Sequence, residues 1–116
     1  PVSAPFHSPL MAPAAKVMKE ALNAVPAHRA EIPLIANVLA SAIEDEKEII
    51  RHLVEQVTGS VRWRESVIFM KENHVTDAIE LGAGKVLSNI VKRSDKDINS
   101  YAVGTPAEIE ELAKNL

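Results

Sequence analysis

Short apolar runs alternate with amphipathic helical patterns along the 116 residues, and this alternation constrains the fold more than any other feature. Residues 32–38 (IPLIANV) are rich in branched side chains and predict a buried strand. Residues 99–103 (NSYAV) predict another, and residues 77–93 predict a strand, a glycine-rich turn and a helix. Residues 1–3 are consistent with the end of a further strand. This order predicts an α/β fold with mostly parallel strands flanked by helices.

Capping residues indicate where the helices begin. Ser8 and Pro9 are typical of an N-cap and a first helical position, and Pro13 predicts a tightened or bent second turn. Asp45, with a glutamate three residues later, predicts the N-cap of a helix that ends at residues 58–60 (TGS). The first of these helices presents one apolar face at three- and four-residue spacing, which indicates packing against a neighbour.

Two more helices follow in the second half of the chain. Trp63 begins a pattern that predicts a helix ending near Asn73. In residues 105–116 (TPAEIEELAKNL), Thr105 and Glu108 form a predicted capping box. The expected inner face of this last helix consists of Ile109, Leu112, Ala113 and Leu116.

Composition excludes several classes of function. The chain has no cysteine, which rules out disulfides, cysteine zinc sites and thiol catalysis. Aromatic residues make up 3% and the net charge is -3, so a nucleic-acid surface is not expected. No run of apolar residues is long enough for a membrane span and no signal peptide is present, so we expect a cytoplasmic protein. Because the first residue is Pro1, we expect a fragment or one part of a split polypeptide.

His7, in the loop ahead of the first helix, is the candidate catalytic residue. A strand-to-helix loop lies where α/β sites form, and a helix N-terminus favours the neutral imidazole that a general base needs. The alternative is a loop histidine whose nitrogens are satisfied locally. Ser8 is not a credible partner nucleophile, because adjacent side chains rarely face each other and N-capping accounts for it. No serine lies in a G-x-S-x-G elbow.

Other candidate sites are weaker. Residues 82–85 (GAGK) could cradle a phosphate, but they lack the full phosphate-loop spacing, and a tight turn that needs small residues is the alternative. His28, His52 and His74 show no metal-binding spacing, so we expect no metal site. Trp63 is interpreted as a core or interface anchor rather than a ligand-stacking residue.

Three stretches in this order resemble the malonyl-CoA:acyl carrier protein transacylase family: VSAPFHSPLMAPA, LVEQVTGSVRWRESV and ELGAGKVLSNIVKR. The resemblance covers essentially the whole chain but only about the last third of a family member. It implies that residues 1–116 are the C-terminal portion of the large, α/β-hydrolase-like acyltransferase subdomain. The N-terminal portion and the small ferredoxin-like subdomain would be absent from this chain.

The resemblance also implies a chemistry and two site residues. The family moves malonyl from coenzyme A to a serine, and then to the phosphopantetheine thiol of acyl carrier protein. His7 matches the catalytic histidine, which acts as the general base. Gln56 matches the residue whose backbone carbonyl orients that histidine in place of a triad carboxylate. No cofactor is implied, because coenzyme A thioester and phosphopantetheine are substrates.

Several parts of the family's active site are absent from this chain. The nucleophilic serine, the loop that helps form the oxyanion hole and the arginine that pairs with the malonyl carboxylate would all lie upstream, so this chain alone is predicted to be inactive. Phe6 resembles the residue that limits the acyl pocket in malonyl-selective members. Ala83 stands where the family commonly has proline. This difference affects no residue to which the resemblance assigns a catalytic role.

Three functions remain open at this point. The first is a stand-alone acyltransferase of fatty acid synthesis, with malonyl-CoA, acyl carrier protein and the missing N-terminal part as partners. The second is a piece of an acyltransferase domain excised from a polyketide synthase or a multifunctional fatty acid synthase. The third is a non-catalytic scaffold or binding fragment that retains the fold.

Overall fold

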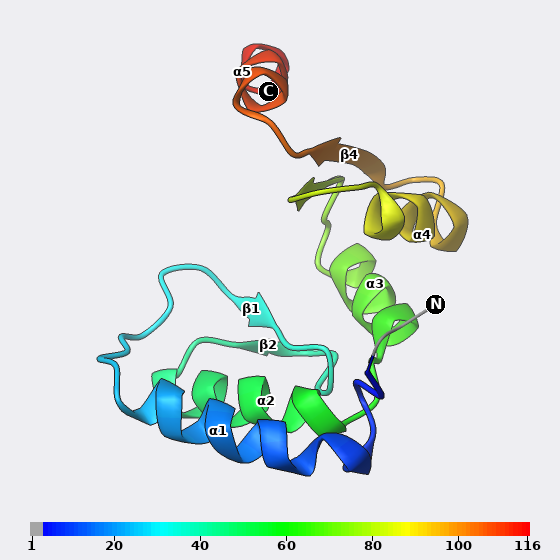
Figure 1. Ribbon diagram of the computed structural model, residues 1–116. Helices are drawn as coiled ribbons and strands as arrows, with labels where there is room; N and C mark the ends of the chain where they lie inside the picture. Colours follow the sequence, from blue (N-terminus) through cyan, green and yellow to red (C-terminus); the bar gives the residue numbers. More distant parts are fainter. Residues whose placement is uncertain (1–3) are drawn as a thin grey trace. The chain divides into compact units, whose positions relative to one another are not determined.

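The structure is a computed structural model that describes residues 4–116, so the strand end expected in residues 1–3 lies outside the described residues. The chain divides into two compact units, Pro1–Ser66 and Val67–Leu116. Figure 1 shows the elements of each unit in chain order. The helix α3 (Trp63–Glu72) crosses the boundary between the units, and its bounds agree with the helix predicted from Trp63 to about residue 73.

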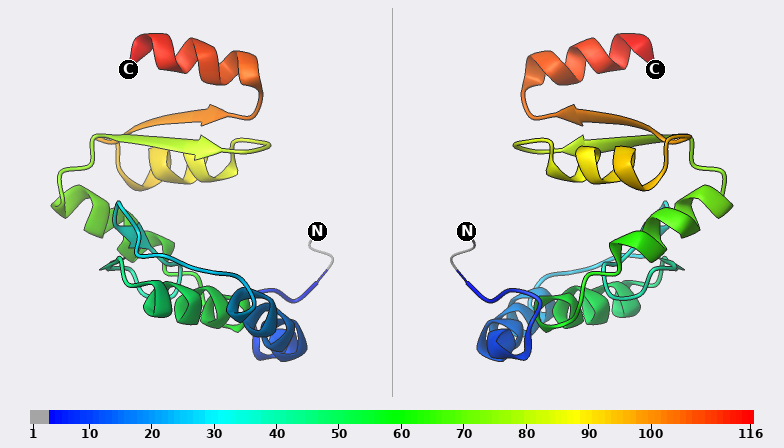
Figure 2. Two further views of the ribbon diagram at one scale, coloured as in Figure 1. Left: turned by 90° about the vertical axis from the view of Figure 1, so that its left-hand side faces the viewer. Right: turned by 90° about the vertical axis from the view of Figure 1, so that its right-hand side faces the viewer.

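The first unit is built on two helices. The helix α1 (Ala12–Asn23) and the helix α2 (Glu46–Thr58) lie side by side, as Figures 1 and 2 show. A short 3-10 helix, η1 (Pro9–Met11), precedes α1. Pro13 is therefore in the first turn of α1, where its missing N–H costs no helical hydrogen bond. The predicted tightening does not fall at Pro13: the 3-10 geometry lies earlier, in η1, which ends at Met11.

The strands of the first unit are shorter than the sequence predicts. The strands β1 (Leu34–Ile35) and β2 (Ala42–Ile43) form an antiparallel pair, with Leu34 opposite Ile43. The prediction of a buried strand over residues 32–38 was therefore wrong in length, although Ala36 is buried. Only Leu34 and Ile35 pair with β2, and the chain then turns, with the N–H groups of Leu39 and Ala40 donating to the carbonyl of Ala36.

The helix α2 begins after Asp45 and ends within residues 58–60, as predicted. The carboxylate of Asp45 accepts hydrogen bonds from the backbone N–H groups of Lys47 and Glu48. At the other end, the N–H of Gly59 donates to the carbonyl of Glu55 at 2.8 Å. The helix thus ends within the TGS segment.

The second unit is a βαβα segment. The strands β3 (Asp77–Leu81) and β4 (Asn99–Val103) pair in parallel along five residues, from Asp77–Asn99 to Leu81–Val103. The helices α4 (Val86–Ser94) and α5 (Pro106–Asn115) lie on opposite faces of this sheet, as Figure 2 shows. The predicted α/β fold with parallel strands and flanking helices is confirmed, with β1 and β2 as an antiparallel exception.

Two hydroxyl-to-carbonyl hydrogen bonds tie α4 to β4. The Ser88 hydroxyl donates to the carbonyl of Tyr101, and the Ser100 hydroxyl donates to the carbonyl of Ser88. At the start of α5, Thr105 and Glu108 form the predicted capping box. The predicted inner face of α5 is largely uncovered among the described residues: Ile109 is 50% exposed, and only Leu112 is partly buried. Over residues 4–116, no helix has the length and apolar character needed to cross a membrane.

Candidate active site

His7 lies in the loop before η1, and its backbone has an unusual conformation. Its φ is 61°, in the left-handed region that residues with a Cβ seldom occupy. Such a conformation costs of the order of 1 kcal/mol or more and persists only where surrounding contacts enforce it. The imidazole belongs to an exposed residue, so substrate-sized groups can reach it.

Two hydrogen bonds hold His7 against the end of α2. The backbone N–H of His7 donates to the carbonyl of Val57 at 3.0 Å, and its ring Nδ1 lies 2.8 Å from the carbonyl oxygen of Gln56. Because a carbonyl oxygen can only accept, Nδ1 carries the proton. The other ring nitrogen, Nε2, therefore presents a lone pair, as a general base requires.

The two carbonyls come from the last turn of α2, where carbonyl oxygens have no partner within the helix. Sequence reasoning placed His7 ahead of a helix N-terminus. The family resemblance, and not the local pattern, connected the ring with the Gln56 carbonyl at the end of a different helix, where positive charge is favoured. No local pattern reports this contact, because 49 residues separate His7 from Gln56.

Gly59 sets the path of the chain beyond these carbonyls. A Cβ built on Gly59 would lie 2.8 Å from Cγ1 of Val38 and 3.0 Å from the carbonyl oxygen of Glu55. Both separations are shorter than ordinary van der Waals contacts. The chain can therefore follow this path after α2 only with a residue at position 59 that has no side chain.

Ser8 differs from expectation. It occupies the N-cap position of η1, but within the described residues its side chain makes no capping hydrogen bond. Its hydroxyl instead donates to the carbonyl of Pro5 at 2.7 Å. The N-cap position was predicted correctly and the role of the hydroxyl was not, because a three-residue 3-10 helix leaves the side chain free to close the preceding turn.

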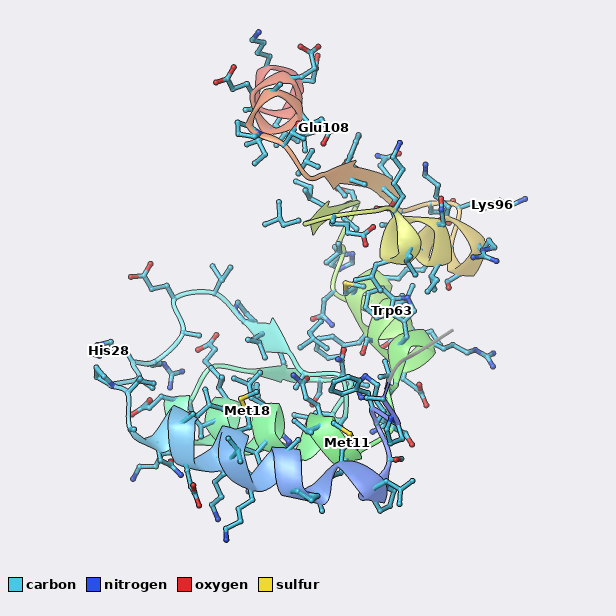
Figure 3. The ribbon with its side chains drawn as sticks, viewed as in Figure 1. Met11, Met18, His28, Trp63, Lys96 and Glu108 are labelled. Atoms are coloured by element: carbon cyan, nitrogen blue, oxygen red, sulfur yellow. The ribbon has the colours of Figure 1, made fainter. Side chains whose placement is uncertain are left out.

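Phe6 precedes His7 and is 60% exposed, so its ring is not part of the core of this chain. His28 lies in the loop between α1 and β1, where Figure 3 labels it, whereas His7 precedes η1. His52 is buried on α2, and its Nδ1 lies 2.8 Å from a carboxylate oxygen of Glu55. In residues 4–116 no group of three histidine or acidic side chains is arranged to hold a metal ion.

The Gly82–Lys85 turn links β3 to α4. Gly82 and Gly84 have φ values of 136° and 89°, which favour glycine. The carboxylate of Glu80 accepts hydrogen bonds from the backbone N–H groups of Ser88 (2.9 Å) and Leu87 (3.2 Å). These bonds, first that from Ser88, hold the pKa of Glu80 below its usual value. Since a carboxylate occupies the helix N-terminus, a tight turn accounts for the motif better than a phosphate cradle does.

Trp63, at the start of α3, is half-buried (Figure 3). Its indole Nε1 is buried and has no hydrogen-bond partner among the residues that the structure describes. The role of Trp63 as a core or interface anchor stays a prediction.

Known proteins resemble this chain closely. No protein-family model matches it. A malonyl CoA-acyl carrier protein transacylase of Bacillus subtilis (strain 168) is 42% identical over 109 residues, which are 94% of this chain and 34% of that protein. The acyl-carrier-protein-S-malonyltransferase structure from Bartonella henselae has a TM-score of 0.89 and 48% identity, over 99% of this chain and 37% of the other. A malonyl-transacylase solved in complex with a type II PKS acyl-carrier protein has a TM-score of 0.87 and 31% identity, over 99% of this chain and 37% of that one.

The fold is thus that of part of an acyltransferase of the malonyltransferase class, with helices and a parallel sheet. The chain spans about a third of the length of the curated relatives it matches. Over nearly all of its own length it is similar to malonyl CoA-acyl carrier protein transacylase, and the partial coverage is consistent with a C-terminal fragment.

Proposed function

We propose that this chain is the histidine-bearing part of a malonyl-CoA:acyl carrier protein transacylase, with His7 as the general base. The observation that carries the proposal is the 2.8 Å contact between Nδ1 of His7 and the main-chain oxygen of Gln56. In a chain so similar to malonyltransferases, this contact supplies what the chemistry needs: one ring nitrogen fixed as a donor and the other left basic.

The proposed reaction has two acyl transfers. In the first, Nε2 of His7 takes the proton of a serine hydroxyl, the serine oxygen attacks the malonyl thioester, and coenzyme A leaves with that proton. In the second, Nε2 takes the proton of the phosphopantetheine thiol, the sulfur attacks the malonyl ester, and the serine oxygen leaves and recovers the proton. The carbonyl end of α2 offsets the positive charge that the ring carries during each transfer.

The remaining parts of the site would come from polypeptide outside this chain. We propose that this polypeptide supplies the nucleophilic serine, the oxyanion hole and the clamp for the malonyl carboxylate. Malonyl-CoA and acyl carrier protein would be the partners, the latter in fatty acid or polyketide synthesis. No resident cofactor is needed, because both thiols arrive as parts of substrates.

The test is His7→Ala in a complete enzyme that contains this segment. We expect the rate of serine malonylation to fall by at least about 100-fold, the lower end of general-base contributions. Quenched-flow sampling followed by intact-mass measurement reports the acyl-enzyme directly. Malonylation at the parent rate would refute the role of His7.

Gln56→Ala is the matched control. The proposed contact uses the main-chain oxygen, so removal of the Gln56 side chain should leave the malonylation rate within about threefold of the parent, since less than 1 kcal/mol is at stake. A collapse of the rate with an intact fold would show that the side chain itself takes part.

A further inference from the structure

We propose that Ser8 is a positioning residue, whose hydroxyl locks the Pro5–Ser8 turn and so holds His7 in its left-handed, base-competent conformation. This inference rests on the proposed function, because it concerns the same imidazole. The hydroxyl of Ser8 donates to the carbonyl of Pro5 at 2.7 Å, and His7 is one of the two residues that this bond encloses.

The need for such a lock follows from the backbone of His7. A φ of 61° is disfavoured for a residue with a side chain, so the loop would relax unless contacts on both sides of His7 prevented it. The bonds from His7 to Val57 and Gln56 restrain one side. The Ser8 hydroxyl restrains the turn itself, and the N–H of Met11 then donates to the carbonyl of Ser8, which connects the turn to η1.

Other roles for Ser8 do not fit its contacts. A nucleophile would face the basic ring nitrogen, but the Ser8 hydroxyl is committed to the carbonyl of Pro5. An N-cap side chain would accept from an N–H group of the helix, and within the described residues it accepts from none. Among the contacts of residues 4–116, the hydroxyl acts only on the turn that contains the proposed base.

The experiment compares substitutions at Ser8 in the complete enzyme. Ser8→Ala should lower the rate constant for serine malonylation about tenfold, which corresponds to about 1.4 kcal/mol of transition-state stabilisation. The malonyl-CoA concentration for half-maximal rate should stay unchanged, because no substrate contact is removed. Ser8→Thr keeps the hydroxyl on an extended backbone (φ −136°, ψ 160°) that a β-branched residue accepts, so it should restore the rate to near the parent value.

Ser8→Cys keeps nearly the same side-chain size, but its thiol is a weaker hydrogen-bond donor than the hydroxyl. If Ser8→Ala fails to fold, this variant still tests whether the hydrogen bond to Pro5 matters. We expect it to lose most of what Ser8→Ala loses. The matched control is Ser94→Ala on α4, which also removes a hydroxyl-to-carbonyl bond, from Ser94 to Ile90 at 2.8 Å, and should leave the rate unchanged.

The outcomes separate this inference from the proposed function. Parent rates in both Ser8→Ala and Ser8→Cys, or a Ser8→Thr variant as slow as Ser8→Ala, would overturn the positioning role of Ser8 while the loss of activity in His7→Ala stood. Unchanged malonylation in His7→Ala would instead overturn the proposed function, and this inference with it.

Discussion

At the scale of single residues, Gln56 contributes a main-chain oxygen, and this makes the site depend on backbone geometry more than on side-chain identity. The acceptor can move only if the last turn of α2 moves. A carboxylate acceptor would offer full charge but would need its own rotamer to be held in place. A helix carbonyl is positioned by the helix itself, at the cost of weaker stabilisation of the imidazolium.

A substitution at Phe6 tests which acyl group the complete enzyme selects. In the complete enzyme, we expect its ring to shorten the acyl pocket, so Phe6→Ser should raise the ratio of methylmalonyl to malonyl labelling by about tenfold. A single methyl group in an apolar pocket is worth about 1–3 kcal/mol. Competition between malonyl-CoA and methylmalonyl-CoA, followed by intact-mass measurement, gives this ratio. An unchanged ratio would show that Phe6 does not limit the pocket.

The limits of sequence reasoning are visible at His7 and Ser8. A resemblance was enough to connect His7 with Gln56, because two of the three matching stretches contain these positions. The left-handed backbone of His7 and the bond from Ser8 to Pro5 have no counterpart in periodicity or spacing. Both depend on where α2 ends relative to the loop, which is a tertiary property.

At the scale of elements, the end of α2 determines where the carbonyls that bind His7 lie. A substitution at Gly59 tests this dependence. Gly59→Ala would push its Cβ against Val38 and against the backbone of Glu55, and so displace the turn that presents the Gln56 and Val57 carbonyls. We expect the malonylation rate of the complete enzyme to fall about tenfold or more, since small misplacements of catalytic groups cost up to about 100-fold.

Val38→Ala provides the control for Gly59. Alone, it should change the rate little. Combined with Gly59→Ala, it should recover part of the lost rate, because it frees the 2.8 Å contact but leaves the one to the Glu55 oxygen. Purely additive effects of the two substitutions would argue against this steric account.

Glu80 on β3 gives α4 an N-terminal cap from outside the helix, and this predicts a pH dependence. Its pKa is lowered in the folded protein by the N–H groups of Ser88 and Leu87. Its stabilising contribution is therefore present above the ordinary glutamate pKa of about 4.3 and is lost as the pH falls through the lower folded value. Glu80→Gln should lower the melting temperature near neutral pH, and the difference from the parent should vanish in acid.

Thermal unfolding and amide exchange of α4 across this pH range measure that effect. Glu110→Gln, on the exposed surface of α5, is the control and should not alter the pH dependence. A difference between parent and Glu80→Gln that stays constant with pH would exclude the charge as the cause.

Helices with capping signals agreed with prediction, whereas the short strands of the first unit did not. Asp45 and Thr105 cap their helices as expected, because capping depends on residues three positions apart. The strand β2 was not predicted, since two residues carry no periodicity. The effect of Pro13 on the helix could not be predicted from the sequence, because it depends on whether the α-helix begins before or after Met11.

At the scale of the whole molecule, apolar surface remains uncovered in both units. In the second unit, Leu81 at the end of β3 is 76% exposed, and Ile79 on the same face is 40% exposed. Parallel sheets are normally covered on both faces and have more than two strands. This surface accords with a chain that matches only about a third of its relatives.

The corresponding prediction concerns the chain by itself. The 116 residues contain no G-x-S-x-G elbow, so incubation with malonyl-CoA should yield no acyl-enzyme. Intact-mass measurement of the incubated chain checks this, with a complete enzyme as the positive control. Stoichiometric acylation of the isolated chain would mean that a nucleophile within it had been overlooked.

The positive φ of His7 has a consequence for how such a sequence can change over time. Glycine would be the better residue here for folding, because it occupies this region freely, yet it would remove the imidazole. A screen for thermal tolerance alone would therefore favour loss of the proposed base. Under the proposed role of His7, selection for turnover retains a histidine at a position where the backbone conformation favours glycine.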